Sequence, residues 1–258
     1  MRDDLWERIS SLRLTLDQTQ ALIKVDKEEV EKFYQPLASY LLERLSPPGR
    51  LVAAIAGPPG SGKTAFGTVL AETINAVAGR ESAICLGLDG WHFPNAYLDA
   101  HFVEHNGSRV VLRSIKGATE TYDVRAAYRC LQLIRNNERV SFPKYSRKLH
   151  DPVPDAGVIE PHHRIILVEG NYWLLEEQPW QDIQALFDLS IFLSAPAERL
   201  TEGLRKRHLR GAKSSTAVEE QIQNVDLHNI EHVLKYSVQA DVVVNKIDNR
   251  WIAKIIFL

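Results

Sequence analysis

The chain has 258 residues, of which 45% are hydrophobic, and this is enough apolar material for one large core or for one core with a small appendage. A formal net charge of −2 gives no overall basic field, so non-specific nucleic-acid binding is not expected. Residues 1–10 lack the apolar stretch of a signal peptide, and no apolar run approaches the roughly 20 residues of a membrane helix. The two cysteines suit a reducing compartment, and we expect a cytoplasmic protein with neither nucleic acid nor a membrane as partner.

Residues 1–48 predict an N-terminal extension, a β-hairpin followed by a helix. Apolar residues alternate with polar ones over 12–16 and again over 21–25, with a turn-like segment between them. Asp26 followed by Glu29 resembles the capping pair that begins a helix, and Pro36 predicts a kink or a restart within that helix. The Pro- and Gly-containing segment 46–49 then marks the boundary to a second domain over 49–258.

In the second domain, short apolar runs alternate with helical patterns. We expect buried strands at 51–56, 82–88, 164–168, 187–193 and 241–244, and helices at 64–76, 123–135, 197–209 and 217–238. Such alternation is typical of a parallel α/β sheet with helices on both faces. The apolar residues at 251–257 are placed to add an edge strand.

A glycine-rich motif lies between the first of these strands and the helix that follows it. It matches G-x-x-x-x-G-K-[ST] in full: Gly57, Pro58, Pro59, Gly60, Ser61, Gly62, Lys63 and Thr64. Glycines let the backbone turn its N–H groups toward phosphate oxygens, and the helix N-terminus adds its positive dipole. Lys63 is expected to reach the β- and γ-phosphates of ATP, and the Thr64 hydroxyl to ligate Mg²⁺. The motif alone leaves a kinase, a GTPase switch and a motor or ABC-type ATPase open.

Two acidic residues follow other predicted strands. Asp89 comes at the end of strand 82–88, and ligands of open α/β sheets bind at the carboxyl ends of strands. A carboxylate there can accept the proton of an attacking hydroxyl. Glu169 ends strand 164–168 in a Walker-B-like arrangement, where it would hold a water bound to Mg²⁺.

Basic residues gather after the fourth predicted strand: Arg199, Arg205, Lys206, Arg207, His208, Arg210 and Lys213. Charge runs are usually solvated helix faces. Beside a phosphate loop, this one favours a lid over about 199–216, whose arginines clamp the triphosphate as charge develops in transfer.

The order of the motifs resembles that of a known group of proteins. They are the glycine-rich loop at 57–64, LDGWHFPNAYLDAH at 88–101, KGATETYDV at 116–124, FPKYSRKLHDPV at 142–153, VEGNYWLL at 168–175 and D-x-x-N at 226–229. The chain resembles the phosphoribulokinase/uridine kinase/pantothenate kinase superfamily of P-loop kinases. In particular it resembles bacterial nucleoside/nucleotide kinase family proteins known as fructose transport system kinases. The similarity covers nearly the whole chain, from the predicted hairpin to about Asn245.

This resemblance implies a P-loop NTPase kinase fold, with five parallel strands in the order 2-3-1-4-5, helices on both faces and a helical lid. It implies Asp89 as general base and Glu169 near Mg²⁺. It also implies an acceptor site formed, with Asp89, by mixed polar and aromatic side chains: His92, Asn95, Lys116, Tyr122, Asp123, Tyr145, Arg147 and Asn229.

The chain departs from the pattern of the group at several positions. Trp91 stands where the group usually has Phe, Thr119 where it has Pro, and extra residues lie between 102 and 114. These changes border the acceptor site, so the identity of the acceptor does not carry over. Relatives commonly have Arg where this chain has Gly203. Arg199 and Arg207 flank that position at a helical spacing of four, and we expect both to contact the nucleotide, with Arg207 catalytic.

We therefore expect an ATP-dependent kinase that phosphorylates an alcohol group, first of a sugar or sugar-like molecule and second of a nucleoside or vitamin-like alcohol. Two other classes remain. Residues 245–248 match the guanine-reading motif N-K-x-D of a GTP-binding switch, although only ten residues follow and no D-x-x-G follows the third strand. The second remaining class is a non-catalytic regulator that binds ATP. The sequence also leaves a homodimer open.

Overall fold

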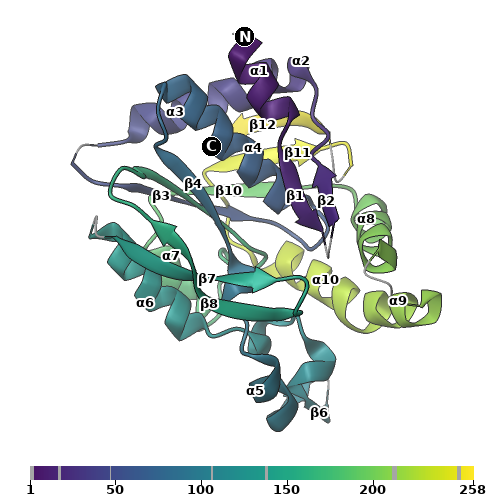
Figure 1. Ribbon diagram of the computed structural model, residues 1–258. Coiled ribbons are helices and arrows are strands. Elements are labelled where there is room, and N and C mark those ends of the chain that lie inside the picture. Colours follow the sequence, from purple (N-terminus) through teal and green to yellow (C-terminus); the bar gives the residue numbers. More distant parts are fainter. Residues whose placement is uncertain are drawn as a thin grey trace.

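The computed structural model describes residues 3–16, 19–46, 48–105, 107–136, 139–210, 214–248 and 251–258. A central sheet of six described strands runs in the order β4-β9-β3-β10-β11-β12 (Figure 1). The first five pair in parallel, in the expected order 2-3-1-4-5, and β12 adds an antiparallel edge. The strands are β3 Leu51–Ala56, β4 Ala83–Gly87, β9 Ile165–Glu169, β10 Leu189–Ser194, β11 Val242–Lys246 and β12 Ile252–Phe257.

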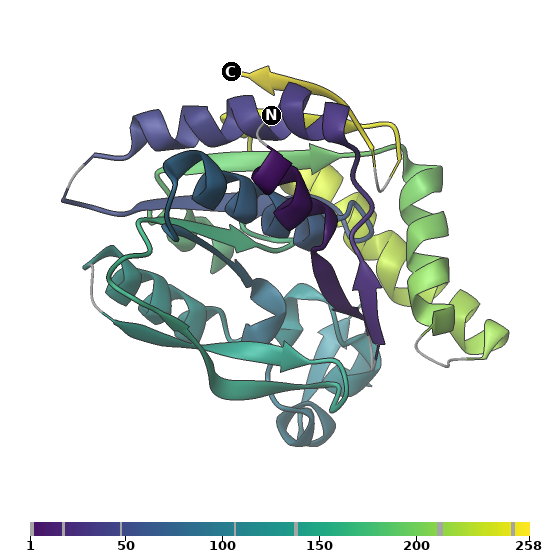
Figure 2. The ribbon, with the colours of Figure 1, turned by 45° about the horizontal axis from the view of Figure 1, so that its top comes forward.

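Helices cover both faces of the sheet because its central strands are apolar on both sides. All six residues of β3 are buried, and they point alternately to opposite faces. Ile55 and its neighbours face α1 Asp3–Ser10, α3 Gln35–Arg44 and α4 Lys63–Ala78. Val52 and its neighbours face α6 Val124–Arg135, α7 Trp180–Gln184 and α10 Leu227–Tyr236. Figure 2 shows helices on both sides of the sheet.

The N-terminal extension forms the expected hairpin, β1 Arg13–Leu16 and β2 Thr19–Leu22, whose predicted turn includes residues 17 and 18, outside the described residues. The side chain of Asp26 accepts a hydrogen bond from the Glu29 amide at 2.7 Å and so begins the helix as expected. That helix is irregular next to Pro36: α2 Lys27–Glu29 passes through a π-helical turn before α3 starts. The short helix α1 was not predicted.

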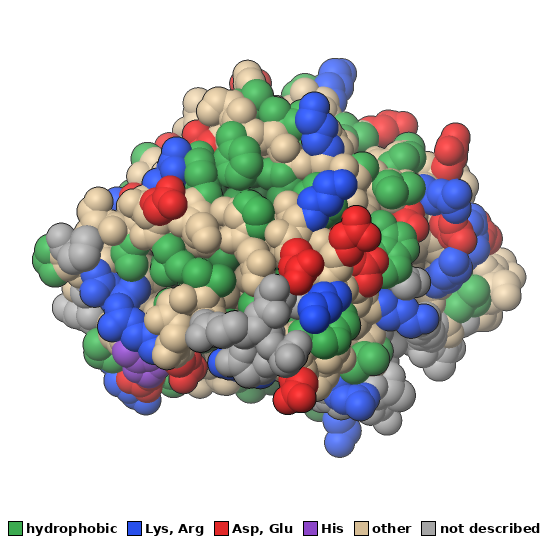
Figure 3. All heavy atoms as spheres, turned by 90° about the horizontal axis from the view of Figure 1, so that it is seen from above, with side chains coloured by type: hydrophobic (Ala, Val, Ile, Leu, Met, Phe, Trp, Pro, Cys, Tyr) green, Lys and Arg blue, Asp and Glu red, His purple; other side chains and the backbone are tan. Residues whose placement is uncertain are grey.

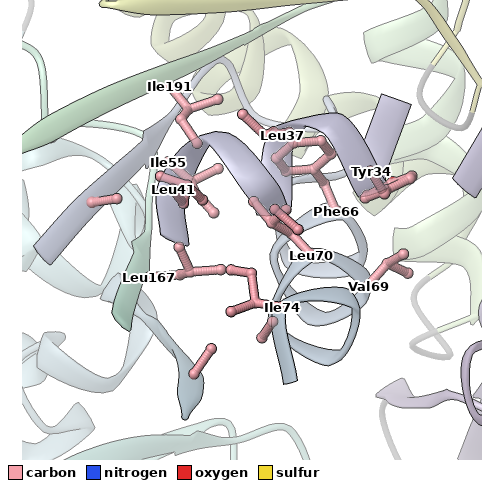
Figure 4. Close-up of a cluster of buried hydrophobic side chains, with 14 of the residues drawn as sticks. Tyr34, Leu37, Leu41, Ile55, Phe66, Val69, Leu70, Ile74, Leu167 and Ile191 are labelled. Carbon is pink, nitrogen blue, oxygen red and sulfur yellow. The ribbon is translucent and has the colours of Figure 1, made fainter. Parts of the chain in front are cut away.

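The extension shares one core with the sheet. Leu37 and Leu41 are fully buried and lie against Ile55 and Leu70 (Figure 4). The ring of Tyr34 lies 5.3 Å from that of Phe66 on α4. The hydrophobic face of the N-terminal extension therefore belongs to the main core and does not enclose a separate core.

Several elements near the carboxyl ends of the strands were not predicted. They are α5 Asn95–Ala100, the hairpin β5 Phe102–His105 with β6 Ser108–Val111, and the long hairpin β7 Val140–Ser146 with β8 Asp151–Ile159. The extra residues between 102 and 114 form the first of these hairpins. The expected helix 197–209 is α8 Ala197–Arg210. The expected helix 217–238 is instead α9 Ser215–Gln221, a π-helical turn and α10.

The face seen in Figure 3 mixes basic and acidic side chains among separate hydrophobic areas. Among the residues that the structure describes, no helix is long and apolar enough to cross a membrane.

Candidate active site

The phosphate-binding loop, residues 57–64, joins β3 to α4 and depends on its glycines. Gly57, Gly60 and Gly62 have φ angles of 145°, 84° and 85°, which side-chain-bearing residues rarely adopt. A Cβ on Gly57 would lie 2.4 Å from the carbonyl oxygen of Leu193, and one on Gly60 would lie 2.7 Å from that of Leu200. The loop therefore packs directly against the end of β10 and against α8.

Lys63 is buried and held by the loop itself. Its Nζ donates to the carbonyl oxygens of Gly57 and Pro58, both at 2.9 Å. Burial lowers the pKa of Lys63 to about 8, while the charges of Glu169 and Asp89 oppose that shift. The ammonium group is thus placed within the loop, beside both acidic residues predicted for the site.

A second buried lysine supports the loop from β11. Lys246 Nζ donates to the carbonyl oxygen of Ser61 at 3.1 Å, and burial lowers its pKa to about 8. Asp248 of the same N-K-x-D motif accepts a hydrogen bond from the Trp251 amide at 2.8 Å. The N-K-x-D pattern is typical of residues that read a guanine base. In the structure, Lys246 instead contacts the phosphate-binding loop and Asp248 a turn.

Thr64 and Glu169 meet beside the loop. The Thr64 hydroxyl donates to Oε1 of Glu169 at 2.9 Å. Gly87 at the end of β4 leaves room for this carboxylate, because a Cβ there would lie 3.1 Å from Oε1. Burial and the charge of Asp89 raise the pKa of Glu169, and Lys63 opposes them. A hydroxyl and a carboxylate are oxygen donors of the kind that Mg²⁺ takes, so the two residues fit this ion.

Asp89 follows β4 in a 3-10 turn, with its side chain 45% exposed. The Tyr122 hydroxyl donates to its Oδ1 at 3.3 Å, and Nη2 of Arg147 lies 3.8 Å from Oδ2. Burial tends to raise the pKa of Asp89. The positive charges around it outweigh this effect and hold the pKa below its usual value. These charges belong to His92, Arg147, Arg207 and Lys63. Asp89 is therefore ionised at neutral pH.

The β7–β8 hairpin approaches Asp89 because the next residue is glycine. A Cβ on Gly90 would lie 2.2 Å from the carbonyl oxygen of Pro143 in β7. This close approach brings Tyr145 and Arg147 to the site. The ring of His92 lies 3.9 Å from that of Tyr122 and 5.6 Å from that of Tyr145. Burial lowers the pKa of His92, against the opposing charge of Asp89.

Lys116 and Asn95 form a second polar group, next to Tyr145. Lys116 Nζ donates to Oδ1 of Asn95 at 2.6 Å and to the carbonyl oxygen of His150 at 2.8 Å. The same nitrogen lies 5.0 Å from the ring centre of Tyr145. Burial first, and the charge of Arg113 second, lower the pKa of Lys116 to about 8.

Two predicted acceptor residues have structural contacts. Asp123 caps α6 by accepting from the Ala126 amide at 2.9 Å. Asn229 Nδ2 donates to the carbonyl oxygen of Gly117 at 3.2 Å, and the Tyr172 hydroxyl donates to that same oxygen at 2.6 Å. Both residues hold the backbone of segments that carry other site residues.

The basic residues of α8 divide by their partners. Arg205 pairs with Glu219 at 2.6 Å and Arg199 with Glu202 at 3.0 Å. Arg207 has no ion pair within the described part of the chain, and its charge acts on the pKa values of both Asp89 and Lys63. Arg207 thus acts electrostatically on the site, whereas Arg205 is paired with Glu219 on α9. Lys213 of the predicted lid is outside the described residues.

Another possible metal cluster among the described residues lies at the opposite, amino edge of the sheet. It comprises Glu81, His162 and His163. His163 Nδ1 accepts a hydrogen bond from the Glu160 amide at 2.9 Å, so its Nε2 carries the proton and donates to Glu81 at 3.2 Å. A protonated nitrogen cannot ligate a metal, and this cluster is better described as a hydrogen-bonded group.

Comparison with known proteins identifies the family. The model of the phosphoribulokinase/uridine kinase family matches residues 52–253. The uncharacterized protein YggC of Escherichia coli K12 is 34% identical over 239 residues, covering 90% of this chain and 94% of that protein. A "putative uridine kinase" of Schizosaccharomyces pombe is 29% identical over 229 residues, covering 87% and 95%.

A solved structure agrees with this assignment. The crystal structure of a "putative fructose transport system kinase" from Silicibacter sp. TM1040 matches with a TM-score of 0.72 at 31% identity. The match covers 81% of this chain and 98% of that one. The chain belongs to the phosphoribulokinase/uridine kinase family and is a phosphotransferase with the P-loop kinase fold.

Proposed function

We propose that the protein transfers the γ-phosphate of Mg-ATP to an alcohol group of a small molecule, with Asp89 as general base. The observation that carries this proposal is the position of Asp89, ionised and half exposed at the end of β4, next to the strand that carries Glu169. An alcohol is a poor nucleophile, and a carboxylate within hydrogen-bond reach can take its proton as the new bond to phosphorus forms.

The remaining proposed site residues bind the nucleotide and stabilise the negative charge of its phosphates. Lys63 lies within the phosphate-binding loop and is assigned to the β- and γ-phosphates. Thr64 and Glu169 would hold Mg²⁺, which neutralises phosphate charge when it is bound. Arg207 from α8 is assigned to the charge that develops during transfer, and Arg199, which pairs with Glu202, to a lesser contact with the nucleotide.

For the acceptor, we propose a sugar or sugar-like alcohol, with a nucleoside as the second candidate. The polar and aromatic side chains around Asp89 suit a molecule with several hydroxyl groups; they are His92, Asn95, Lys116, Tyr122, Tyr145 and Arg147. The names of the relatives, a "putative fructose transport system kinase" and a "putative uridine kinase", are consistent with these two classes.

The test is Asp89→Asn, measured for ATP affinity, melting temperature and ADP release stimulated by a panel of alcohols. Asparagine keeps the size of the side chain and can still accept from Tyr122, but it is not basic. We expect ATP binding and folding to survive and phosphate transfer to fall by about 10²- to 10⁴-fold. In the same assays, Lys63→Ala should weaken ATP binding and abolish turnover.

Each failure has a distinct meaning. Full activity of Asp89→Asn would show that another group is the base or that none is needed. Loss of ATP binding or of the fold would make Asp89 structural. A wild-type protein that binds ATP yet transfers phosphate to no alcohol would favour the ATP-binding regulator instead.

A further inference from the structure

Arg113 was not among the predicted site residues, yet it lies next to them. It belongs to the 3-10 turn Leu112–Ile115 that leads from β6 into the Lys116 segment. The Lys116 amide donates to the Arg113 carbonyl oxygen at 3.4 Å, and the charge of Arg113 acts on the pKa values of both Lys116 and Tyr145. Arg113 therefore adds a second cation on the Lys116 side of the acceptor site.

The guanidinium of Arg113 is incompletely satisfied. Its Nη1 is buried and has no hydrogen-bond partner among the described residues. A guanidinium stays protonated in proteins, so this N–H group cannot be neutralised by loss of a proton. Buried donors without an acceptor are rare and costly, so a ligand group that supplied an acceptor to Arg113 would be stabilised there.

Lys116 also lacks a full counter-charge. Its two hydrogen-bond acceptors, Asn95 Oδ1 and the carbonyl oxygen of His150, are neutral. Across the described ranges, no carboxylate lies within ion-pair distance of its ammonium group; Asp151, Asp89 and Asp99 act on its pKa from farther away. Oδ1 of Asp151 accepts a hydrogen bond from the backbone amide of Asn95 at 2.8 Å. An ammonium group has three donors, so one remains for a ligand.

The acceptor site has the carboxylate of Asp89 on one side and the two cations Arg113 and Lys116 on the other. Asp89 is ionised at one end, and its neighbour Arg147 offsets it. Arg113 and Lys116 lie at the other end, and Tyr145 lies between: its ring is near both His92, which contacts Asp89, and the Lys116 ammonium. Contacts through His92 and Tyr145 thus connect the Asp89 side of the site with the Lys116 side.

We propose that the acceptor is acidic, and that Arg113 and Lys116 bind its carboxylate or phosphate group while its hydroxyl faces Asp89. This inference rests on the proposed function and narrows it from alcohols in general to sugar acids, sugar phosphates and smaller hydroxy acids. A planar guanidinium matches the two oxygens of such a group, and the ammonium group adds a point charge.

The experiment compares matched pairs of acidic and neutral alcohols. The pairs are gluconate with glucose, ribose 5-phosphate with ribose, and glycerate with glycerol. Binding to the full chain is measured by calorimetry in the presence of a non-hydrolysable ATP analogue with Mg²⁺, and acceptor-stimulated ADP release is measured separately with ATP. We expect at least one acid to bind about 10-fold or more tightly than its neutral partner. Preferential binding of the carboxylates or of the phosphate identifies which acidic group the site recognises.

Substitutions then locate the binding group. Arg113→Gln and Lys116→Gln should each weaken binding of the acid by about 10- to 100-fold and leave ATP affinity unchanged. Lys116→Arg should restore much of the binding because it keeps the charge. Arg109→Gln, an exposed arginine on β6, is the matched control and should have no effect. Melting temperatures show whether each variant is folded, and the Lys116 pair remains informative if Arg113→Gln is not.

Opposite results would overturn the proposal. If no acid binds, or if neutral alcohols bind and react as well as the acids, the acceptor is not selected by charge, while an alcohol kinase with Asp89 as base still stands. If an acid binds through Arg113 and Lys116 but no alcohol stimulates ADP release, the proposed function fails and the anion site remains.

Discussion

Asp89 and Glu169 lie at the ends of neighbouring strands, and their surroundings shift their pKa values in opposite directions. Cations hold the pKa of Asp89 down, whereas burial and the charge of Asp89 raise that of Glu169. Two carboxyl groups with separated pKa values commonly have different roles. Here the ionised Asp89 suits a base, and Glu169, bonded to Thr64, suits a metal-binding group whose charge Mg²⁺ would stabilise.

Arg207 and Arg205 provide a matched test of α8. Arg207→Ala should lower kcat by about 10²-fold or more with a smaller effect on acceptor binding, because charge in the transition state would lose a donor. Arg205→Ala breaks only an exposed ion pair with Glu219 and should change kcat little. The measurement is steady-state kinetics of both variants. The reverse ranking would contradict the assignment and make Arg205 the clamp.

At the residue scale, the sequence identified groups with a fixed spacing but not groups defined by contact. The positions of the loop residues and of the two strand-end acids in the fold could be predicted because motif and strand position determine them. Arg113 and Lys246 could not be assigned, since their roles depend on a buried donor and on a carbonyl that another segment supplies. Asp123 was read as an acceptor residue, although its position before an apolar helical pattern also fits an N-cap.

At the element scale, the parallel sheet was predictable and the hairpins were not. The core strands are continuous apolar runs bounded by helices. By contrast, β8 Asp151–Ile159 contains two prolines and two aspartates, which sequence patterns assign to loops. The two π-helical turns are likewise invisible in the apolar pattern, so the helix at 217–238 was predicted as continuous.

A substitution at Gly90 tests whether the β7–β8 hairpin positions the acceptor. Gly90→Ala would place a Cβ 2.2 Å from the Pro143 carbonyl, and the hairpin would have to move away from Asp89 with Tyr145 and Arg147. We expect the acceptor KM to rise by about 10-fold or more while ATP affinity is unchanged. Gly49→Ala, where a Cβ would lie 3.3 Å from the Ser46 carbonyl, is the control outside the site. An unchanged acceptor KM would mean that the hairpin does not position the acceptor.

At the scale of the whole molecule, the N-terminal extension is expected to unfold together with the sheet. Leu37 is fully buried in the cluster that also contains residues of α4 and of the sheet (Figure 4). Leu22 is 49% exposed. Leu37→Ala should lower the free energy of unfolding by about 2–5 kcal/mol, and Leu22→Ala should change it by less than about 0.5 kcal/mol.

The check is denaturant unfolding of both variants, followed by circular dichroism and by tryptophan fluorescence. A single transition that shifts in both probes would support one cooperative unit. A separate early transition that alone responds to Leu37→Ala would instead show that residues 1–48 form an independent unit.

The carbonyl oxygen of Gly117 connects α10 to the segment that leads from Lys116. It accepts from Asn229 on α10, and Asp226, one turn earlier, bonds to His208 on α8 at 2.7 Å. If α8 closes over the nucleotide, the movement passes through these bonds to the backbone beside Lys116. Nucleotide and acceptor would then be thermodynamically coupled, each raising the affinity for the other by the same factor. The enzyme would thereby favour the ternary complex over either binary one.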